Sequence, residues 1–414
     1  MVNVAILGYG VVGSGVAEVI KKNSESISQR AGTDIKVKWI LDIRDFPDSP
    51  DKDVLTKNAD DVFNDNEVSI IVETIGGAKI AHEFTKRALM AGKSVVTSNK
   101  ELVATHGPEL LQLAKENGVS YLFEASVGGG IPIIRPLNQC LAANEINGIT
   151  GILNGTTNYI LTQMKREGKS FEAALKEAQQ NGYAEQNPTA DVEGHDACRK
   201  IAILSSIAYN EFVDCENIYT EGITKITVDD MKYADAIGGV IKLIAVSKKA
   251  NGKIFARVSP AIVLNEHPLA NVEDVFNAIV VNGDAVGDAM FYGRGAGKLP
   301  TASAVVADVI DIAKHPGSGT ASVWERTQQN NILPIEDSTT KFLVRVTAKN
   351  KEDAKKDILS IFGEIQLVEL HSKVKDNEFA FISCKNTESE FKTKLDKLES
   401  ASDITVLNRI RIEE

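Results

Sequence analysis

The first 125 residues alternate between short β-branched, apolar runs and longer segments of helical character, and no other feature limits the fold as strongly. Runs that are apolar on both faces suit strands buried between two layers, and intervening helices are the crossovers that parallel strands require. We therefore predict an α/β fold with a Rossmann-type, doubly wound parallel sheet over residues 1–135. The predicted strands are VNVAIL, IKVKWIL, VSIIVE, SVVTS and VSYLFEA.

Composition limits the possible partners and location. The chain has 414 residues, 43% hydrophobic and 25% charged, which is typical of a soluble globular protein of two to three domains. A net charge of −11 repels a phosphate backbone, so we expect no nucleic-acid partner. No stretch reaches the roughly 18 apolar residues that span a membrane, so we expect no membrane contact and a cytoplasmic location. Four cysteines without a C-x-x-C pair predict neither a structural zinc site nor a disulfide framework.

Two further domains are expected after the first. Residues 136–297 contain strands in pairs rather than in strand–helix alternation, which predicts a mixed α+β domain with a long helix over about 192–209. A glycine-rich loop then leads into a helix over about 298–325, which we expect to complete the first domain. A polar linker over roughly 328–340 precedes residues 338–414, whose βαββαβ order, with its second strand in EIQLVELHS, is that of a ferredoxin-like domain.

The first candidate site is a glycine-rich turn directly after the first strand and before a helix. In such a turn the first glycine permits the tight bend, the second lets the backbone approach a pyrophosphate, and the third lets helix and strand pack closely. The free N–H groups of the helix N-terminus then face the phosphates, so we predict dinucleotide binding rather than a simple tight turn. The residues are Gly8, Tyr9, Gly10, Val11, Val12 and Gly13.

The end of the second predicted strand bears on the choice between NAD and NADP. Asp42 favours the free ribose hydroxyls of NAD, whereas Arg44 could accept the 2′-phosphate of NADP. Both residues are present, so the sequence leaves the cofactor open. Arg44 and Asp45 could equally form a solvated turn without a role in binding.

Two further strand ends carry candidate residues. Lys100 follows the strand SVVTS, at the edge where ligands bind in open parallel sheets, although a lone lysine is more often a solvated charge. The loop Glu124–Pro132 contains three consecutive glycines. Its backbone carbonyls could ligate a hard cation, or the loop could be a hinge that needs unusual backbone angles.

The fourth candidate site lies in residues 182–200, the part of the chain densest in polar groups. Asp196 and Lys200 are four residues apart, so their side chains share one face of a helix. They could form an ordinary surface ion pair. Because the following sequence IAILSSIAY is apolar nearly all round, a buried pair is also possible, and a buried Lys200 suits acid–base chemistry on an alcohol or carbonyl.

This fourth segment closely resembles homoserine dehydrogenase. The resemblance covers about the first 325 residues, including the glycine-rich turn, Asn99-Lys100, the loop Glu124–Pro132 and Asn154–Asn158. The family pattern is A-x3-G-aromatic-small followed by N/D-P-x2-D-V-x-G-x-D-x3-K. In this chain it is matched by Ala178, Gly182, Tyr183, Ala184, Asn187, Pro188, Asp191, Val192, Gly194, Asp196 and Lys200.

The resemblance implies the reversible oxidation of L-homoserine to L-aspartate 4-semialdehyde with NAD or NADP, within threonine, methionine and isoleucine biosynthesis. It implies that Lys200 is the proton donor and acceptor at the substrate oxygen, and that Lys100 is a second catalytic or cofactor-contacting lysine. Glu185 and Asp196 would hold the amino and hydroxyl groups of the substrate.

The resemblance also implies cofactor and metal contacts. Thr74 and Gly182 would line the nicotinamide side, and a loop ending at Gly297 would close over the cofactor, which Gly8, Gly10, Val11, Val12, Gly13, Arg44 and Lys100 also contact. A sodium ion would be caged by the backbone carbonyls of Glu124, Val127, Gly129 and Ile131.

The same resemblance predicts a dimerisation role for residues 136–297, a homodimer or homotetramer, and a monofunctional enzyme, since the chain begins almost directly at the first nucleotide-binding strand. Residues 338–414 resemble an ACT regulatory module in strand order only, because the loop Ala348–Glu352 lacks the Asp-x-Pro-Gly motif of that module. Threonine as an effector is therefore a hypothesis. Two alternatives remain: another NAD(P)-dependent amino-acid semialdehyde reductase, and a non-catalytic dinucleotide-sensing regulator.

Overall fold

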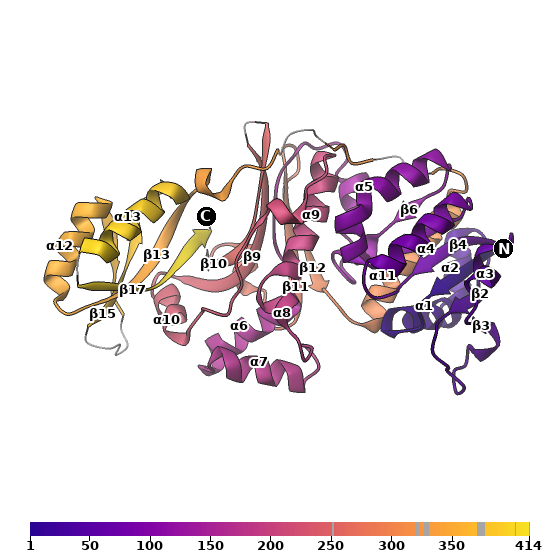
Figure 1. Cartoon of the computed structure of the whole chain (residues 1–414), viewed down its shortest axis with the longest axis horizontal. Coiled ribbons are helices and arrows are strands. Elements are labelled where there is room, and N and C mark those ends of the chain that lie inside the picture. The colour runs from indigo at the N-terminus through magenta and orange to yellow at the C-terminus, as the bar shows by residue number, and fades with distance from the viewer. Residues whose placement is uncertain (251, 320–322, 327–330, 371–376, 402, 414) are drawn as a thin grey trace. The chain divides into compact units, whose positions relative to one another are not determined.

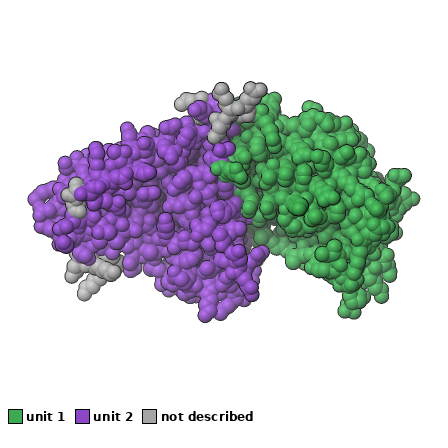
Figure 2. Space-filling view, in the orientation of Figure 1, with its two compact units in different colours: residues 1–147, 199–216, 281–330 green, residues 148–198, 217–280, 331–414 purple. Residues whose placement is uncertain are grey.

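The chain forms two compact units in its computed structural model (Figure 2). Unit 1 comprises residues 1–147, 199–216 and 281–330, and unit 2 comprises residues 148–198, 217–280 and 331–414. The structure describes all residues except 251, 320–322, 327–330, 371–376, 402 and 414. Within the described residues, no helix combines the length and the apolar character that crossing a membrane requires.

Unit 1 is built on a six-stranded sheet in the order β3-β2-β1-β4-β5-β6, and every neighbouring pair is parallel. This order confirms the predicted doubly wound sheet, and it reverses between β1 and β4, where dinucleotides bind in such folds. The strands are β1 (Val2–Leu7), β2 (Ile35–Leu41), β3 (Leu55–Thr56), β4 (Val68–Glu73), β5 (Ser94–Thr97) and β6 (Tyr121–Leu122). Strand β12 (Gly287–Arg294) comes from the later part of this unit.

The helices of unit 1 alternate with these strands along the chain (Figure 1). Helix α11 packs against α1, and both contribute buried alanine and valine side chains to the core beside β1. Gly15 permits this contact, since a Cβ there would lie 3.0 Å from the Lys298 carbonyl oxygen. The helices are α1 (Val11–Lys22), α2 (Ser24–Ala31), α3 (Ala59–Phe63), α4 (Lys79–Met90), α5 (Lys100–Glu116) and α11 (Lys298–Lys314).

Unit 2 contains the mixed sheet that the paired strands predict. Its main strands are neighbours in the order β11-β7-β9-β10-β17-β13-β15-β14. They are β7 (Ile146–Ile152), β9 (Gly239–Ala250), β10 (Lys253–Leu264), β11 (Phe276–Gly283), β13 (Thr339–Ala348), β14 (Ile365–Val368), β15 (Glu378–Ser383) and β17 (Ile404–Glu413), with β8 (Tyr219–Thr220) beside β10 and β16 (Asn386–Thr387) beside β13. The helices are α6 (Gly155–Glu167), α7 (Phe171–Gln180), α8 (Thr189–Val192), α10 (Val228–Ala236), α12 (Lys351–Phe362) and α13 (Glu388–Ala401), with α9 (His195–Tyr209) continuing past the boundary between the units.

The C-terminal residues have the predicted βαββαβ order, formed by β13, α12, β14, β15, α13 and β17. Their last strand, β17, lies between β10 and β13, parallel to the first and antiparallel to the second. Two buried arginines form ion pairs at this junction: Arg257 lies 2.5 Å from Glu413, and Arg411 lies 2.7 Å from the half-buried Glu221. One continuous sheet therefore joins the C-terminal residues to β10.

Three expected elements differ from the structure. The long helix predicted over about 192–209 is present as α9, but it begins only at His195, because Gly194, with φ +84°, separates it from α8. The helix predicted over 298–325 ends at Lys314, since Pro316 follows and the residue before a proline disfavours helical backbone angles. Strand β14 covers only the middle of the predicted EIQLVELHS strand, whose last two residues lie outside the described part of the chain.

Candidate functional site

The glycine-rich turn between β1 and α1 has the geometry of a phosphate site. Gly8 has φ +94°, and a Cβ at Gly13 would lie 1.9 Å from the Gly8 carbonyl oxygen, so both positions require glycine. A Cβ at Gly10 would meet nothing within 4 Å, which leaves open space in front of the helix. Gly10 caps α1 without a side chain, so the first N–H groups of the helix fit the pyrophosphate of a dinucleotide.

Thr74 braces this turn from the neighbouring strand. It directly follows β4, and its Oγ1 donates a hydrogen bond to the Gly8 carbonyl oxygen at 2.9 Å. A Cβ at Gly8 would lie 3.0 Å from the Thr74 carbonyl oxygen, so the ends of β1 and β4 are in close contact. The structure thus places Thr74 where the strand order reverses between β1 and β4.

The end of β2 carries a fixed carboxylate and an exposed cation. Asp42 is buried and accepts hydrogen bonds from the backbone N–H of Tyr9 at 2.7 Å and from the Arg44 guanidinium at 2.9 Å. Hydrogen bonds from Arg44 are the main cause that lowers the pKa of Asp42. Arg44 is 58% exposed and lines a hollow of about 410 Å³ together with Lys52, Lys57 and Asp45, and Asp45 pairs with Lys57 at 2.8 Å.

Lys100 begins α5 at the carboxyl end of β5, as predicted. The preceding Asn99 caps the helix by accepting a hydrogen bond from the Leu102 N–H at 3.0 Å. The side-chain amide of Asn99 also donates to the carbonyl oxygens of Ile75 and Gly77, which ties the start of α5 to the loop after β4. Lys100 is half-buried at this edge.

The Glu124 loop is an internally bonded, buried structure. The Glu124 carboxylate accepts hydrogen bonds from the backbone N–H groups of Ile133, Ile134 and Arg135 at 2.6, 2.9 and 2.6 Å. Such bonds satisfy the backbone donors at the N-terminal end of the helical segment over residues 134–140, which have no partner within the helix. Sequence reasoning assigned Glu124 only a carbonyl role and missed this function of its side chain.

A buried acid on α11 supports the same loop. Asp308 accepts a hydrogen bond from the Glu124 N–H at 2.9 Å and pairs with Arg135 at 2.5 Å. Burial first, and the charge of Glu124 second, raise the pKa of Asp308 to about 7, while Arg135 opposes the rise.

The consecutive glycines of this loop approach a second glycine-rich loop. A Cβ at Gly129 would lie 2.2 Å from the Gly295 carbonyl oxygen, and the Gly130 N–H donates to the Arg294 carbonyl oxygen at 3.2 Å. Gly297, with φ +126°, ends the second loop and caps α11. The glycines of the two loops therefore allow backbone to pack directly against backbone.

The fourth segment gathers carboxylates around one amide. Asn154 caps α6 through its Oδ1, and its Nδ2 donates to Asp191 at 2.7 Å and to Asp196 at 2.9 Å. Asp196 is only 3% exposed and Lys200, one turn later on α9, is 7% exposed, which excludes an ordinary surface pair. The bridging role of Asn154 was not predicted, although the resemblance included the motif that begins with it.

Glu185 and Gly182 lie outside this buried cluster. Both are exposed on the loop between α7 and α8, where Gly182 has φ +74°. The loop is held in part by Gln179, whose side-chain amide donates to the Glu185 carbonyl oxygen at 3.0 Å. The Glu185 carboxylate is therefore accessible to a ligand from solvent.

Comparisons with known proteins agree on one family. Residues 8–124 match the family model "Homoserine dehydrogenase, NAD binding domain", and residues 132–310 match the model "Homoserine dehydrogenase". A homoserine dehydrogenase of Pseudomonas aeruginosa is 42% identical over 88% of this chain and 86% of its own. One of Bacillus subtilis is 37% identical over 99% of this chain and 97% of its own.

Solved structures give the same result. The crystal structure of a homoserine dehydrogenase from Thiobacillus denitrificans is 36% identical and covers 100% of this chain and 98% of its own, with a TM-score of 0.89. A hyperthermophilic archaeal homoserine dehydrogenase in complex with NADPH is 32% identical and covers 75% of this chain and 97% of its own, with a TM-score of 0.64.

Proposed function

Since the chain belongs to the homoserine dehydrogenase family of NAD(P)-dependent oxidoreductases, we propose that Lys200 moves the proton in the interconversion of homoserine and aspartate semialdehyde. NAD(P), when bound, supplies the acceptor or donor of the hydride. In the reductive direction a protonated Lys200 gives its proton to the oxygen of the aldehyde, and in the oxidative direction it receives the proton of the hydroxyl.

The observation that carries this proposal is the burial of Lys200 one helical turn from Asp196. Asp196 is held by Asn154, so its carboxylate has a fixed direction from which to orient the hydroxyl of the substrate. The exposed Glu185 is the group that we propose for the amino group of the substrate. Lys100, at the cofactor edge of the parallel sheet, is proposed as the second lysine of the reaction.

The test is Lys200→Ala, measured by the absorbance of the reduced nicotinamide with homoserine as substrate. We expect turnover to be lost while the affinity for NADPH, measured by fluorescence titration, stays within about twofold, because the glycine-rich turn is untouched. Lys93→Ala is the matched control: Lys93 is 5% exposed and bonds the Asp65 and Val68 carbonyl oxygens, so its loss should lower stability and leave turnover measurable. Near-normal turnover in Lys200→Ala would exclude the assignment.

We propose NADP as the preferred cofactor. Asp42 is already bonded to Arg44 and to the Tyr9 N–H, while the exposed Arg44 and the nearby Lys52 present positive charge to a 2′-phosphate. Arg44→Ala should lower kcat/KM at least tenfold with NADP and less than threefold with NAD. Equal losses with both cofactors would contradict this role for Arg44.

A sodium ion in the Glu124 loop is proposed on the chemistry of its donors. The backbone carbonyls of Glu124, Val127, Gly129 and Ile131 belong to buried residues, and neutral carbonyl oxygens suit a hard cation. Replacing sodium with a bulky organic cation in the buffer should lower the thermal stability. An identical melting curve in both buffers would oppose the proposal.

For residues 338–414 we propose an ACT-like module, with oligomer contacts and threonine inhibition as its two candidate roles. The loop after β13 is occupied by the cap of α12, where Asn350 accepts from the backbone N–H of Asp353. An unchanged rate at millimolar threonine would leave the oligomer role. Light scattering would then distinguish a homodimer from a homotetramer.

A further inference from the structure

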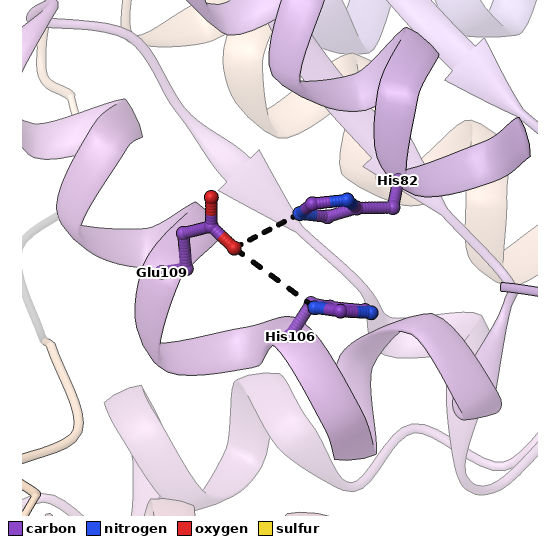
Figure 3. Close-up of side chains that lie close together, drawn as sticks. All are labelled: His82, His106 and Glu109. Atoms are coloured by element: carbon purple, nitrogen blue, oxygen red, sulfur yellow. Dashed lines mark hydrogen bonds and ion pairs between the residues drawn. The ribbon is translucent and has the colours of Figure 1, made fainter. Parts of the chain in front are cut away.

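Two neighbouring helices of unit 1 carry a histidine pair with a shared carboxylate (Figure 3). His82 lies on α4, and His106 and Glu109 lie three residues apart on α5. The two imidazole rings are stacked, with centroids 4.0 Å apart and planes at 22°, and both present a nitrogen to the same carboxylate oxygen. None of these residues belongs to the site described above.

The spacing of the three donor atoms is that of a metal site. Glu109 Oε2 lies 2.9 Å from His82 Nε2 and 3.9 Å from His106 Nδ1, and all three atoms lie within 4.8 Å of one another. Ligands at about 2.0–2.1 Å around a tetrahedral ion are about 3.3 Å apart. The two measured distances lie on either side of that value, so small side-chain rotations bring the donors to an ion.

The surroundings orient the shared carboxylate. Lys86 donates a hydrogen bond to Glu109 Oε1 at 2.8 Å. Lys86 therefore holds Oε1 of the Glu109 carboxylate, while Oε2 faces the two imidazoles.

The turn that carries two of the donors is fixed by packing. Gly107 lies against Trp324, whose Cζ3 would be 2.3 Å from a Cβ at that position, and Pro108 is buried inside α5. A rigid turn between His106 and Glu109 reduces the entropy lost when an ion binds. The side chains of His82, His106 and Glu109 are 23%, 32% and 40% exposed, so water can complete the coordination.

We propose that His82, His106 and Glu109 bind one divalent first-row transition metal, such as Zn²⁺ or Co²⁺, which links α4 to α5. Two imidazoles and a carboxylate are a donor set that zinc uses with three protein ligands and an open position. The ion lies outside the proposed catalytic residues, and its role is to stabilise unit 1.

The experiment is calorimetric titration of the full-length, chelator-treated protein with Zn²⁺, followed by the visible absorption of the Co²⁺ form. We expect one ion per chain, a raised melting temperature, and a tetrahedral cobalt spectrum. His82→Gln and His106→Gln should each weaken binding at least tenfold and abolish the spectrum, while turnover without metal stays at the wild-type level.

Two controls separate this site from adventitious binding. His315→Gln removes a histidine of the same unit that pairs with Asp311, and it should leave zinc binding unchanged. Lys86→Ala removes the hydrogen bond that orients Glu109 but no zinc ligand, and it should weaken zinc binding less than either histidine variant does. The proposal is overturned if the wild type binds no zinc, if both histidine variants bind normally, or if His315→Gln alone loses binding.

Discussion

Asn154→Asp replaces one amide nitrogen with an oxygen and tests how the buried carboxylates are held together. Aspartate caps a helix about as well as asparagine, so the cap of α6 is retained. What disappears are the hydrogen bonds to Asp191 and Asp196, each with a net value of about 1.5–3 kcal/mol because the acceptors are charged. Together they amount to about 3–6 kcal/mol, and repulsion between carboxylates adds to the loss.

The assay combines kcat/KM for homoserine with urea unfolding. A loss of only 3 kcal/mol from transition-state binding corresponds to a fall of more than about 100-fold in kcat/KM. Loss of native-state contacts appears instead as a lower free energy of unfolding. The deficit in unfolding free energy should shrink as the pH falls, since protonation of the introduced carboxyl removes the repulsion.

Asn350→Asp is the matched control for this substitution. Asn350 caps α12 and donates to Asp353 at 2.7 Å, but its side chain is exposed, so the change should stay within about 0.5 kcal/mol. If Asn154→Asp behaves like this control in both stability and kcat/KM, the bridging role of Asn154 is refuted.

Two other predictions concern unit 1. Burial is the main cause that raises the pKa of Glu73 to about 7 from its usual 4.5, so protonation of Glu73 favours the folded state. The stability that this protonation contributes is complete below about pH 4.5 and is lost as the pH rises to 7. Glu73→Gln should remove this pH dependence of the unfolding free energy, roughly 3 kcal/mol, and a variant with an unchanged profile would contradict the assignment. Gly10→Ala should lower NADPH affinity at least tenfold without lowering the melting temperature. Gly13→Ala should lower both the affinity and the melting temperature, because its Cβ would overlap the Gly8 carbonyl oxygen. Fluorescence titration measures the affinity, and thermal melts measure the stability.

Local patterns in the sequence predicted the parts of the fold that depend on local interactions. The parallel sheet and the turn at Gly8–Gly13 follow from uniformly apolar strands and from glycines at fixed spacing. The helix break at Gly194 was missed, because a glycine inside an apolar helical pattern can be tolerated or can end the helix.

The contacts that the sequence did not predict join residues far apart in the chain. Asn154 reaches carboxylates that lie 37 and 42 residues later, and His82 meets a partner on a different helix. Neither pairing has a periodic signal, since each depends on how two elements pack. The resemblance to a family indicated where chemistry occurs but not which side chain holds the carboxylates.

The position of β17 also bears on how this protein is made. Strand β17, which follows β10 far along the chain, fills the place between β10 and β13, so the edge of β10 at Ala261–Val263 stays unpaired until β17 has been translated. About 150 residues separate the two segments, which at about 5–20 residues per second leaves this edge open for roughly 8–30 s. An open strand edge is a site of aggregation during that interval. Deletion of β17 would therefore leave a gap inside the sheet rather than shorten its edge.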